Sequence, residues 1–78
     1  MANILVVEDE ESVRELLRLY LEKEGFKVEL ASDGEEALDK MSRTSPDLVL
    51  LDLMLPKKDG WEVCREIRKT SYVPIIML

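Results

Sequence analysis

Short apolar runs alternate with amphipathic segments along the whole chain. Residues 4–7 and 48–51 are uninterrupted aliphatic runs, a pattern typical of strands that are buried on both faces of a parallel sheet. Residues 26–30 alternate apolar and polar side chains, which predicts a strand with one more polar face, at an edge of the sheet. Residues 73–78 predict a fourth strand, because Pro74 lies near its start, where proline is tolerated.

Three segments between these strands carry apolar residues at the three- and four-residue spacing of an amphipathic helix. The first helix is expected before Gly25, which acts as its stop. The second is expected from Glu35 to about Thr44, because Pro46 prevents continuation. The third follows a loop predicted at residues 53–59. The apolar stripes of the first and third helices are Val13, Leu16, Leu17, Tyr20 and Leu21, and Val63, Cys64 and Ile67.

The alternation of strand and helix predicts an α/β fold. Consecutive parallel strands joined by helices imply right-handed crossovers and a sheet with helices on both faces. The 78 residues are expected to form part of one domain. A core this small supplies only about 3–5 kcal/mol of net stability.

Composition and charge exclude several classes of function. With 46% hydrophobic and 36% charged residues, the chain is typical of a soluble globular protein rather than a disordered or membrane-spanning one. The net charge of −6 disfavours nucleic acid as a direct partner of this segment. The single cysteine, Cys64, allows no internal disulfide and is expected in the core. No signal peptide is visible, so a cytoplasmic location is expected.

Acidic residues follow two of the predicted buried strands. Glu8 and Asp9 come directly after residues 4–7, and Asp52 comes directly after residues 48–51. Ligands of open parallel sheets bind beyond the carboxyl ends of the strands, so the three carboxylates would share one crevice if these strands pair. Taken singly, each acid is more typical of a solvated loop or a helix terminus.

Gathering three anions costs stability unless a cation compensates for their repulsion. Mg²⁺ suits such a place, because it binds one or two carboxylates and completes its octahedron with water and phosphate oxygens. A carboxylate can itself be the nucleophile that forms an aspartyl phosphate, and Asp52 is the best placed of the three. The chain has no histidine and no glycine-rich phosphate loop, so serine-type hydrolysis and a P-loop nucleotide site are poorly supported.

Two motifs resemble the receiver domain of two-component response regulators. They are ILVVEDE at residues 4–10 and PDLVLLDLMLP at residues 46–56, the latter followed by Asp59 and Gly60. The resemblance covers essentially the whole chain. It implies a flavodoxin-like sheet of order 2-1-3-4-5 and a phosphoacceptor role for a module that is not itself an enzyme.

The resemblance also implies roles for particular residues. Asp52 matches the phosphorylated aspartate, Asp9 a direct ligand of Mg²⁺, Glu8 an outer acid that acts partly through water, and the backbone carbonyl of Met54 a third ligand. The implied phosphoryl donor is a phosphohistidine on a sensor histidine kinase. Residues Glu10, Glu11 and Val13 resemble those of regulators that carry a carboxyl-terminal winged-helix DNA-binding domain.

The chain departs from the family pattern at its carboxyl end. The family places a Thr or Ser directly after the fourth strand and a Lys at the end of a fifth, and this sequence stops at Leu78. We therefore expect a receiver domain truncated after the fourth strand, which self-associates through the exposed edge of residues 73–78 as a dimer or larger.

Two alternatives to a phosphoacceptor module are considered from the sequence. One is a self-associating fragment without productive phosphorylation. The other is an aspartate-nucleophile phosphatase, which needs a second acid two residues beyond the nucleophile, where Met54 stands. The remaining aromatic residue of interest, Trp61, is expected to serve local packing.

Overall fold

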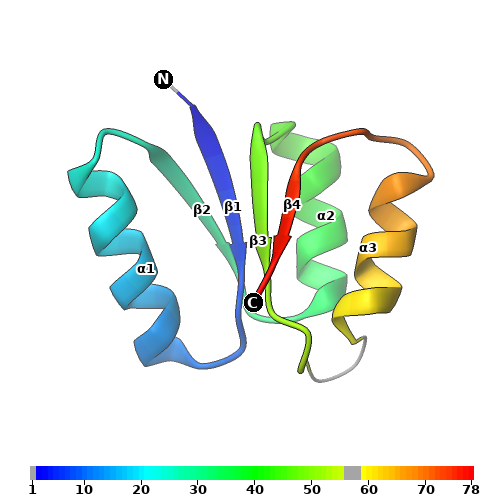
Figure 1. Ribbon diagram of the computed structural model, residues 1–78, viewed down its shortest axis with the longest axis horizontal. Coiled ribbons are helices and arrows are strands. Elements are labelled where there is room, and N and C mark those ends of the chain that lie inside the picture. The colour runs from blue at the N-terminus through cyan, green and yellow to red at the C-terminus, as the bar shows by residue number, and fades with distance from the viewer. Residues whose placement is uncertain (1, 56–58) are drawn as a thin grey trace.

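The chain folds as alternating strands and helices, in the order that the sequence predicts (Figure 1). The structure is a computed structural model that describes residues 2–55 and 59–78. Its elements are β1 (Asn3–Val7), α1 (Glu11–Lys23), β2 (Lys27–Ala31), α2 (Gly34–Thr44), β3 (Leu48–Leu51), α3 (Gly60–Arg68) and β4 (Ile75–Met77). The predicted α/β class is therefore confirmed.

All strands of the sheet run parallel, in the order β2-β1-β3-β4. The two aliphatic runs form the central strands β1 and β3, and the alternating segment forms the edge strand β2, as predicted. In the register, Val7 lies opposite both Ala31 of β2 and Leu51 of β3. The carboxyl ends of these strands therefore meet at one edge of the sheet, the lower edge in Figure 1.

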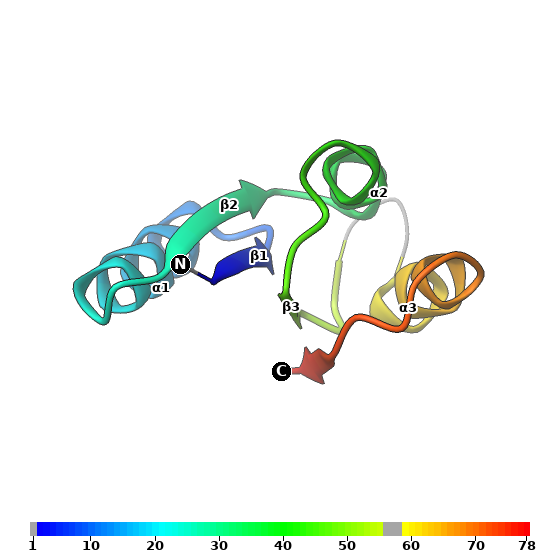
Figure 2. The ribbon, with the colours of Figure 1, turned by 90° about the horizontal axis from the view of Figure 1, so that it is seen from above.

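Helices cover the two faces of the sheet unequally (Figure 2). Helix α1 packs on one face against β1 and β2, while α2 packs on the other face against the same strands and against α3. Side chains alternate between the faces along each strand, so the face under α2 and α3 collects the main core. Its buried members are Leu5, Val7, Ala31, Ala37, Val49, Leu51, Val63 and Ile67.

Strand β1 begins one residue before its predicted start, and the bounds of β2 and β4 also differ from the prediction. Strand β2 begins at Lys27 because the N–H of Phe26 donates to the carbonyl of Leu21, which ties Phe26 to the end of α1. Strand β4 is limited to Ile75–Met77 because both polar backbone groups of Val73 are occupied elsewhere. The Val73 N–H donates to the Ser71 hydroxyl oxygen at 3.1 Å, and the Val73 carbonyl accepts from the Arg68 guanidinium at 2.6 Å. Of the predicted loop at residues 53–59, residues 56–58 lie outside the described part of the chain.

The exposure of several apolar side chains also differs from the prediction. Helix α1 has no buried residue, and Leu16 and Tyr20 of its predicted stripe are 54% and 64% exposed. Trp61 is 58% exposed, so local packing covers it only in part. Cys64 is half-buried against the main core, close to its predicted place. Within residues 2–55 and 59–78, the helices are too short and too polar to cross a bilayer.

Candidate acidic site at the carboxyl edge of the sheet

The acidic residues lie where the two central strands end. The backbone N–H of Asp52 donates to the carbonyl of Val7 at 3.0 Å, and the N–H of Glu8 donates to the carbonyl of Ala31 at 3.0 Å. Each acid is thus the first residue after a strand and is still bonded to the neighbouring strand. This attachment fixes the backbone from which each carboxylate projects.

The structure brings Glu8, Asp9 and Asp52 together. One carboxylate oxygen from each lies within 4.8 Å of the other two. Glu8 is buried, Asp52 is half-buried and Asp9 is exposed, so the group runs from the interior to solvent. Oxygen atoms at such separations, open to water on one side, suit a hard divalent cation that keeps part of its hydration.

The pKa of Glu8 is consistent with a cation-binding site. Burial, with the nearby carboxyls of Asp52 and Asp9, raises the pKa of Glu8 from 4.5 to about 7, against the lowering effect of the Glu10 N–H. A buried carboxyl among other acids keeps its proton unless positive charge is supplied. These donors therefore fit Mg²⁺ in charge and in chemistry.

Two hydrogen bonds from nearby backbone N–H groups orient the carboxylates. The Asp52 Oδ1 atom accepts from the N–H of Met54 at 3.0 Å, and the Glu8 Oε2 atom accepts from the N–H of Glu10 at 3.2 Å. Each carboxylate keeps a second oxygen that is not used in these bonds. The Met54 side chain is 82% exposed and contributes nothing to the core. Its backbone carbonyl as a metal ligand stays a prediction.

Arg14 of helix α1 holds the loop that carries Glu8 and Asp9. The sequence did not predict this role. Its Nη1 atom donates to the carbonyl oxygens of Glu8 and Asp9 at 3.0 and 2.9 Å. A cation in the first turn of a helix opposes the helix macrodipole. That unfavourable position was the available signal that Arg14 has a local partner.

Gly60 lies against the backbone of the phosphoacceptor candidate. A Cβ atom at this position would lie 2.6 Å from the carbonyl oxygen of Asp52 and 2.6 Å from the Cα of Leu53. The N–H of Gly60 donates to the Leu53 carbonyl at 2.9 Å, and the Asp59 side chain caps α3 through the Glu62 N–H at 2.9 Å. In the sequence, Asp59 and Gly60 are a loop signature and part of the family motif. The sequence did not predict this contact, because the close approach depends on the tertiary fold.

A sequence model of the family described as the response regulator receiver domain matches residues 4–78. The chain therefore belongs to this family of signalling domains. Among curated proteins it is 55% identical over 75 residues to the probable transcriptional regulator ycf27 of Guillardia theta, covering 96% of this chain and 30% of that protein. It is 53% identical over 75 residues to the transcriptional regulatory protein ResD of Bacillus subtilis (strain 168), covering 96% of this chain and 31% of that one. The chain thus spans about a third of these relatives.

Solved structures agree with this assignment. The BeF3-activated N-terminal receiver domain of RstA from Klebsiella pneumoniae is 41% identical, with a TM-score of 0.92 over 96% of this chain and 64% of that one. The chemotaxis protein CheY4 of Vibrio cholerae is 35% identical, with a TM-score of 0.95 over 99% of this chain and 67% of that one. The flavodoxin-like receiver fold expected from the sequence is confirmed.

Proposed function

We propose that Asp52 accepts a phosphoryl group from a phosphohistidine of a sensor histidine kinase, within a two-component phosphorelay. The observation that carries this proposal is the convergence of Glu8, Asp9 and Asp52, whose carboxylate oxygens lie within 4.8 Å of one another in a receiver domain. Asp52 is the proposed acceptor because its backbone is bonded to β1 while its side chain is half-buried beside the other two acids.

On the acceptor side, the transfer needs a positioned nucleophile. A carboxylate oxygen of Asp52 attacks the phosphorus atom, a P–O bond forms, and the P–N bond to the donor histidine breaks. The electron pair of that bond returns to the imidazole nitrogen, which takes up a proton. The N–H of Met54 holds the Oδ1 atom of Asp52, which leaves Oδ2 as the attacking oxygen in our proposal.

Mg²⁺ would neutralise the charge that gathers on the phosphoryl oxygens during transfer. The residues proposed to hold it are Asp9 and Asp52 directly, Glu8 partly through water, and Met54 through its backbone carbonyl. The raised pKa of Glu8, which follows from burial beside other acids, supports a cation at this place. Arg14 holds the backbone of Glu8 and Asp9, two of these four residues.

The test of the acceptor is phosphorylation by a small-molecule phosphodonor with Mg²⁺, followed by peptide mass spectrometry. Asp52→Asn should abolish incorporation, while Asp39→Asn on the exposed side of α2 should leave it unchanged. The same assay on this 78-residue chain and on a version that continues beyond Leu78 shows whether the Thr or Ser and the Lys of the family pattern are needed. Phosphate retained in Asp52→Asn would overturn the assignment.

The metal site is tested by titrating Trp61 fluorescence with Mg²⁺. Trp61 follows Gly60, whose backbone touches that of Asp52, so bound metal should change its emission. Asp9→Ala should weaken binding most. An equal response in the wild type and in Asp9→Ala would show that the ion binds elsewhere.

The larger setting of the domain also belongs to this proposal. We assign residues 1–78 to the amino-terminal part of one receiver domain in a cytoplasmic protein that is not an enzyme. The relatives named above are transcriptional regulators of about three times this length, which supports an output in transcription through another domain. This segment itself, with a net charge of −6, is not proposed to bind nucleic acid.

Self-association of the chain is the last part of the proposal. Among the described residues, β4 pairs with β3 on one side only, and Ile76 and Leu78 are 50% and 54% exposed. The unpaired edge is three residues long, shorter than the sequence indicated. Sedimentation at micromolar concentration should show a dimer or larger for this chain, and a folded 9.0 kDa monomer alone would contradict this part.

A further inference from the structure

A single row of hydrogen bonds crosses the sheet at the edge that carries the acids. Each donor in the row is the first residue after a strand, and each acceptor is the last residue of the neighbouring strand. The bonds run from Glu8 N–H to Ala31 C=O at 3.0 Å, from Asp52 N–H to Val7 C=O at 3.0 Å, and from Leu78 N–H to Leu51 C=O at 2.9 Å.

The row is continuous through peptide units. The N–H of Glu8 and the carbonyl of Val7 belong to the same peptide group, so that group accepts from Asp52 while it donates to Ala31. The two acids proposed to bind metal and phosphate are therefore attached to one rigid line of peptides. A change in any hydrogen bond of the row changes the strength of its neighbours, because hydrogen bonds in a chain polarise one another.

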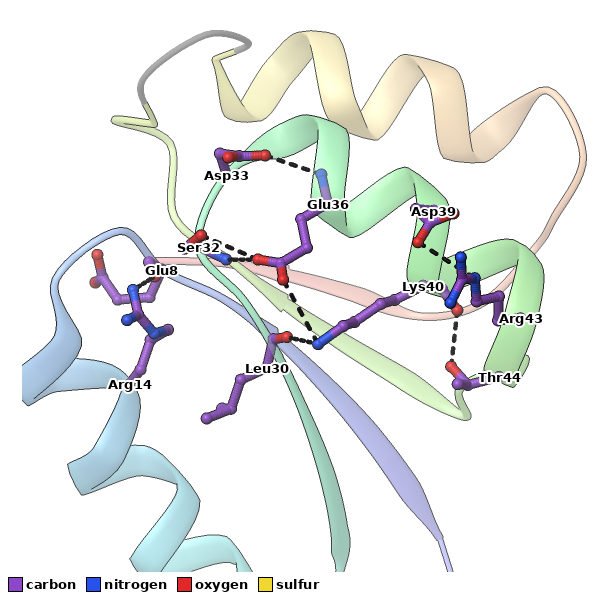
Figure 3. A network of polar contacts seen from close by, with 10 residues as sticks. All are labelled: Glu8, Arg14, Leu30, Ser32, Asp33, Glu36, Asp39, Lys40, Arg43 and Thr44. Carbon is purple, nitrogen blue, oxygen red and sulfur yellow. Dashed lines mark hydrogen bonds and ion pairs between the residues drawn. The ribbon is translucent and has the colours of Figure 1, made fainter.

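The row of hydrogen bonds ends at the edge strand β2. There the last N–H of the row donates to a carboxylate. The peptide group that offers the Ala31 carbonyl also carries the N–H of Ser32, which donates to Glu36 Oε1 at 2.6 Å. The Ser32 hydroxyl donates to the same oxygen at 3.0 Å. Figure 3 shows the Glu36 side chain reaching back from α2 to this peptide.

Glu36 is itself held in place from two sides. Its backbone N–H donates to Asp33 Oδ1 at 2.8 Å, which fixes the first turn of α2. Its Oε2 atom lies 3.8 Å from the Lys40 ammonium, and that ammonium also donates to the carbonyl of Leu30 in β2 (Figure 3). The Ser32 N–H lowers the pKa of Glu36, so its carboxylate is charged at neutral pH.

We propose that Glu36 is a positioning residue of the phosphoacceptor site, acting through the Ala31–Ser32 peptide on the backbones of Glu8 and Asp52. A charged acceptor forms a hydrogen bond about twice as strong as a neutral one. The Glu36 carboxylate therefore sets the orientation of the first peptide in the row, and the row transmits that orientation to both acids. This inference rests on the proposed function, because it concerns the geometry of the same site.

The first readout is the amide spectrum of the row, measured by ¹H–¹⁵N NMR in the full natural chain that contains residues 1–78. Glu36→Ala should move the amide proton of Ser32 upfield. Smaller shifts of the same sign should follow at Glu8 and then at Asp52. Glu36→Gln, which keeps a neutral acceptor oxygen, should restore about half of each shift.

The second readout is metal affinity, measured with Mn²⁺ by the loss of the free-ion EPR signal well below the unfolding temperature. Glu36→Ala should weaken binding by about 3- to 10-fold. This is less than the tenfold or more typical of partners that contact a ligand directly, because one peptide group intervenes. Glu36→Gln should lie between the wild type and Glu36→Ala, since it keeps the hydrogen bond at about half the strength.

Asp39→Asn is the matched control, because it removes one acid of an exposed ion pair with Arg43 on the same helix. It should alter neither the amide row nor the Mn²⁺ affinity. The positioning role would be overturned if the amide shifts in Glu36→Ala stop at Ser32, or if Glu36→Ala leaves Mn²⁺ binding unchanged. In either case Asp9→Ala should still lose the metal. Mn²⁺ binding that is equal in the wild type and in Asp9→Ala would overturn the proposed metal site, and this role with it.

Discussion

The two faces of the sheet differ in how completely the chain covers them. On the face under α2 and α3, Val7 and Leu51 are fully buried. The residue one position earlier on each strand faces α1. On that side Val6 of β1 is fully buried, whereas Ile76 of β4, in the same register, is 50% exposed. Residues one position apart on the same strands thus lie in different surroundings.

The two faces are expected to serve different properties: one supports the stability of the fold, and the other is available for association. The face under α2 and α3 holds a closed core that supports the ends of β1 and β3, where the acids project. On the side of α1, four apolar side chains are each at least half exposed: Leu16, Leu19 and Tyr20 of α1, and Ile76 of β4. An apolar surface of this kind usually marks a place for another protein segment. We expect substitutions on the two faces to affect different properties.

The largest effect is expected from truncating the covered face. Leu51→Ala removes a fully buried side chain and should lower the free energy of unfolding by about 2–5 kcal/mol, the range for cavity-forming Leu→Ala changes. Leu50→Ala, one residue earlier on the half-buried α1 face, should cost clearly less. Urea denaturation of both variants measures the difference, and equal losses would show that the two faces are equally well packed.

A second contrast compares Gly60 with Gly25, two glycines that differ in what surrounds them. Gly60→Ala places a methyl group 2.6 Å from the backbone of Asp52 and Leu53, so the loop must move. It should cost about 1–3 kcal/mol, as overpacking does, and it should slow phosphorylation of Asp52.

Gly25→Ala is the comparison, because Gly25 has a φ of 92° but nothing within 4 Å of the added atom. It should cost about 1–2 kcal/mol through backbone strain and leave phosphorylation unchanged. Thermal unfolding and a phosphorylation time course report both properties. Loss of phosphorylation in Gly25→Ala to the same degree would refute a local role for Gly60.

The sequence predicted the element order and the placement of the acids, because both follow from local patterns. Uninterrupted aliphatic runs identified β1 and β3, and the acids at their ends followed from the rule for parallel sheets. Arg14 and Glu36 were not found, because their partners are backbone groups that only the tertiary fold brings near. The start of β4 was misplaced for a similar reason, since the Arg68 guanidinium donates to the Val73 carbonyl.

The exposed α1 face should tolerate polar substitution. Leu19→Ser changes a side chain that is 57% exposed, so the free energy of unfolding should change by no more than about 0.5 kcal/mol, as for ordinary surface positions. The same change should reduce self-association, because it makes the exposed apolar surface more polar. Sedimentation and urea denaturation together test this. A large loss of stability with unchanged association would place Leu19 in a core instead.

The smallest effect is expected in the acid dependence of stability at α2. Hydrogen bonds from Ser32 lower the pKa of Glu36 in the folded state, with a contribution from Lys40. A lowered pKa adds stability above the unfolded value of 4.5, and that stability is lost as the pH falls through the folded value. The wild type should therefore exceed Glu36→Gln at neutral pH and lose this advantage in acid. Melting curves from pH 7 to 3 check the sign, and an advantage that grows in acid would contradict it.

The most direct test of the whole account is a phosphorylation time course of Asp52, followed by intact mass with a small-molecule phosphodonor in Mg²⁺ and in excess EDTA. In Mg²⁺, the wild type should gain the mass of one phosphoryl group, located at Asp52 by peptide mapping. EDTA, or Asp9→Ala in Mg²⁺, should slow that gain strongly, because the charge on the phosphoryl oxygens is no longer compensated. Incorporation at Asp52 that is equally fast with Mg²⁺, with EDTA and in Asp9→Ala would contradict the account.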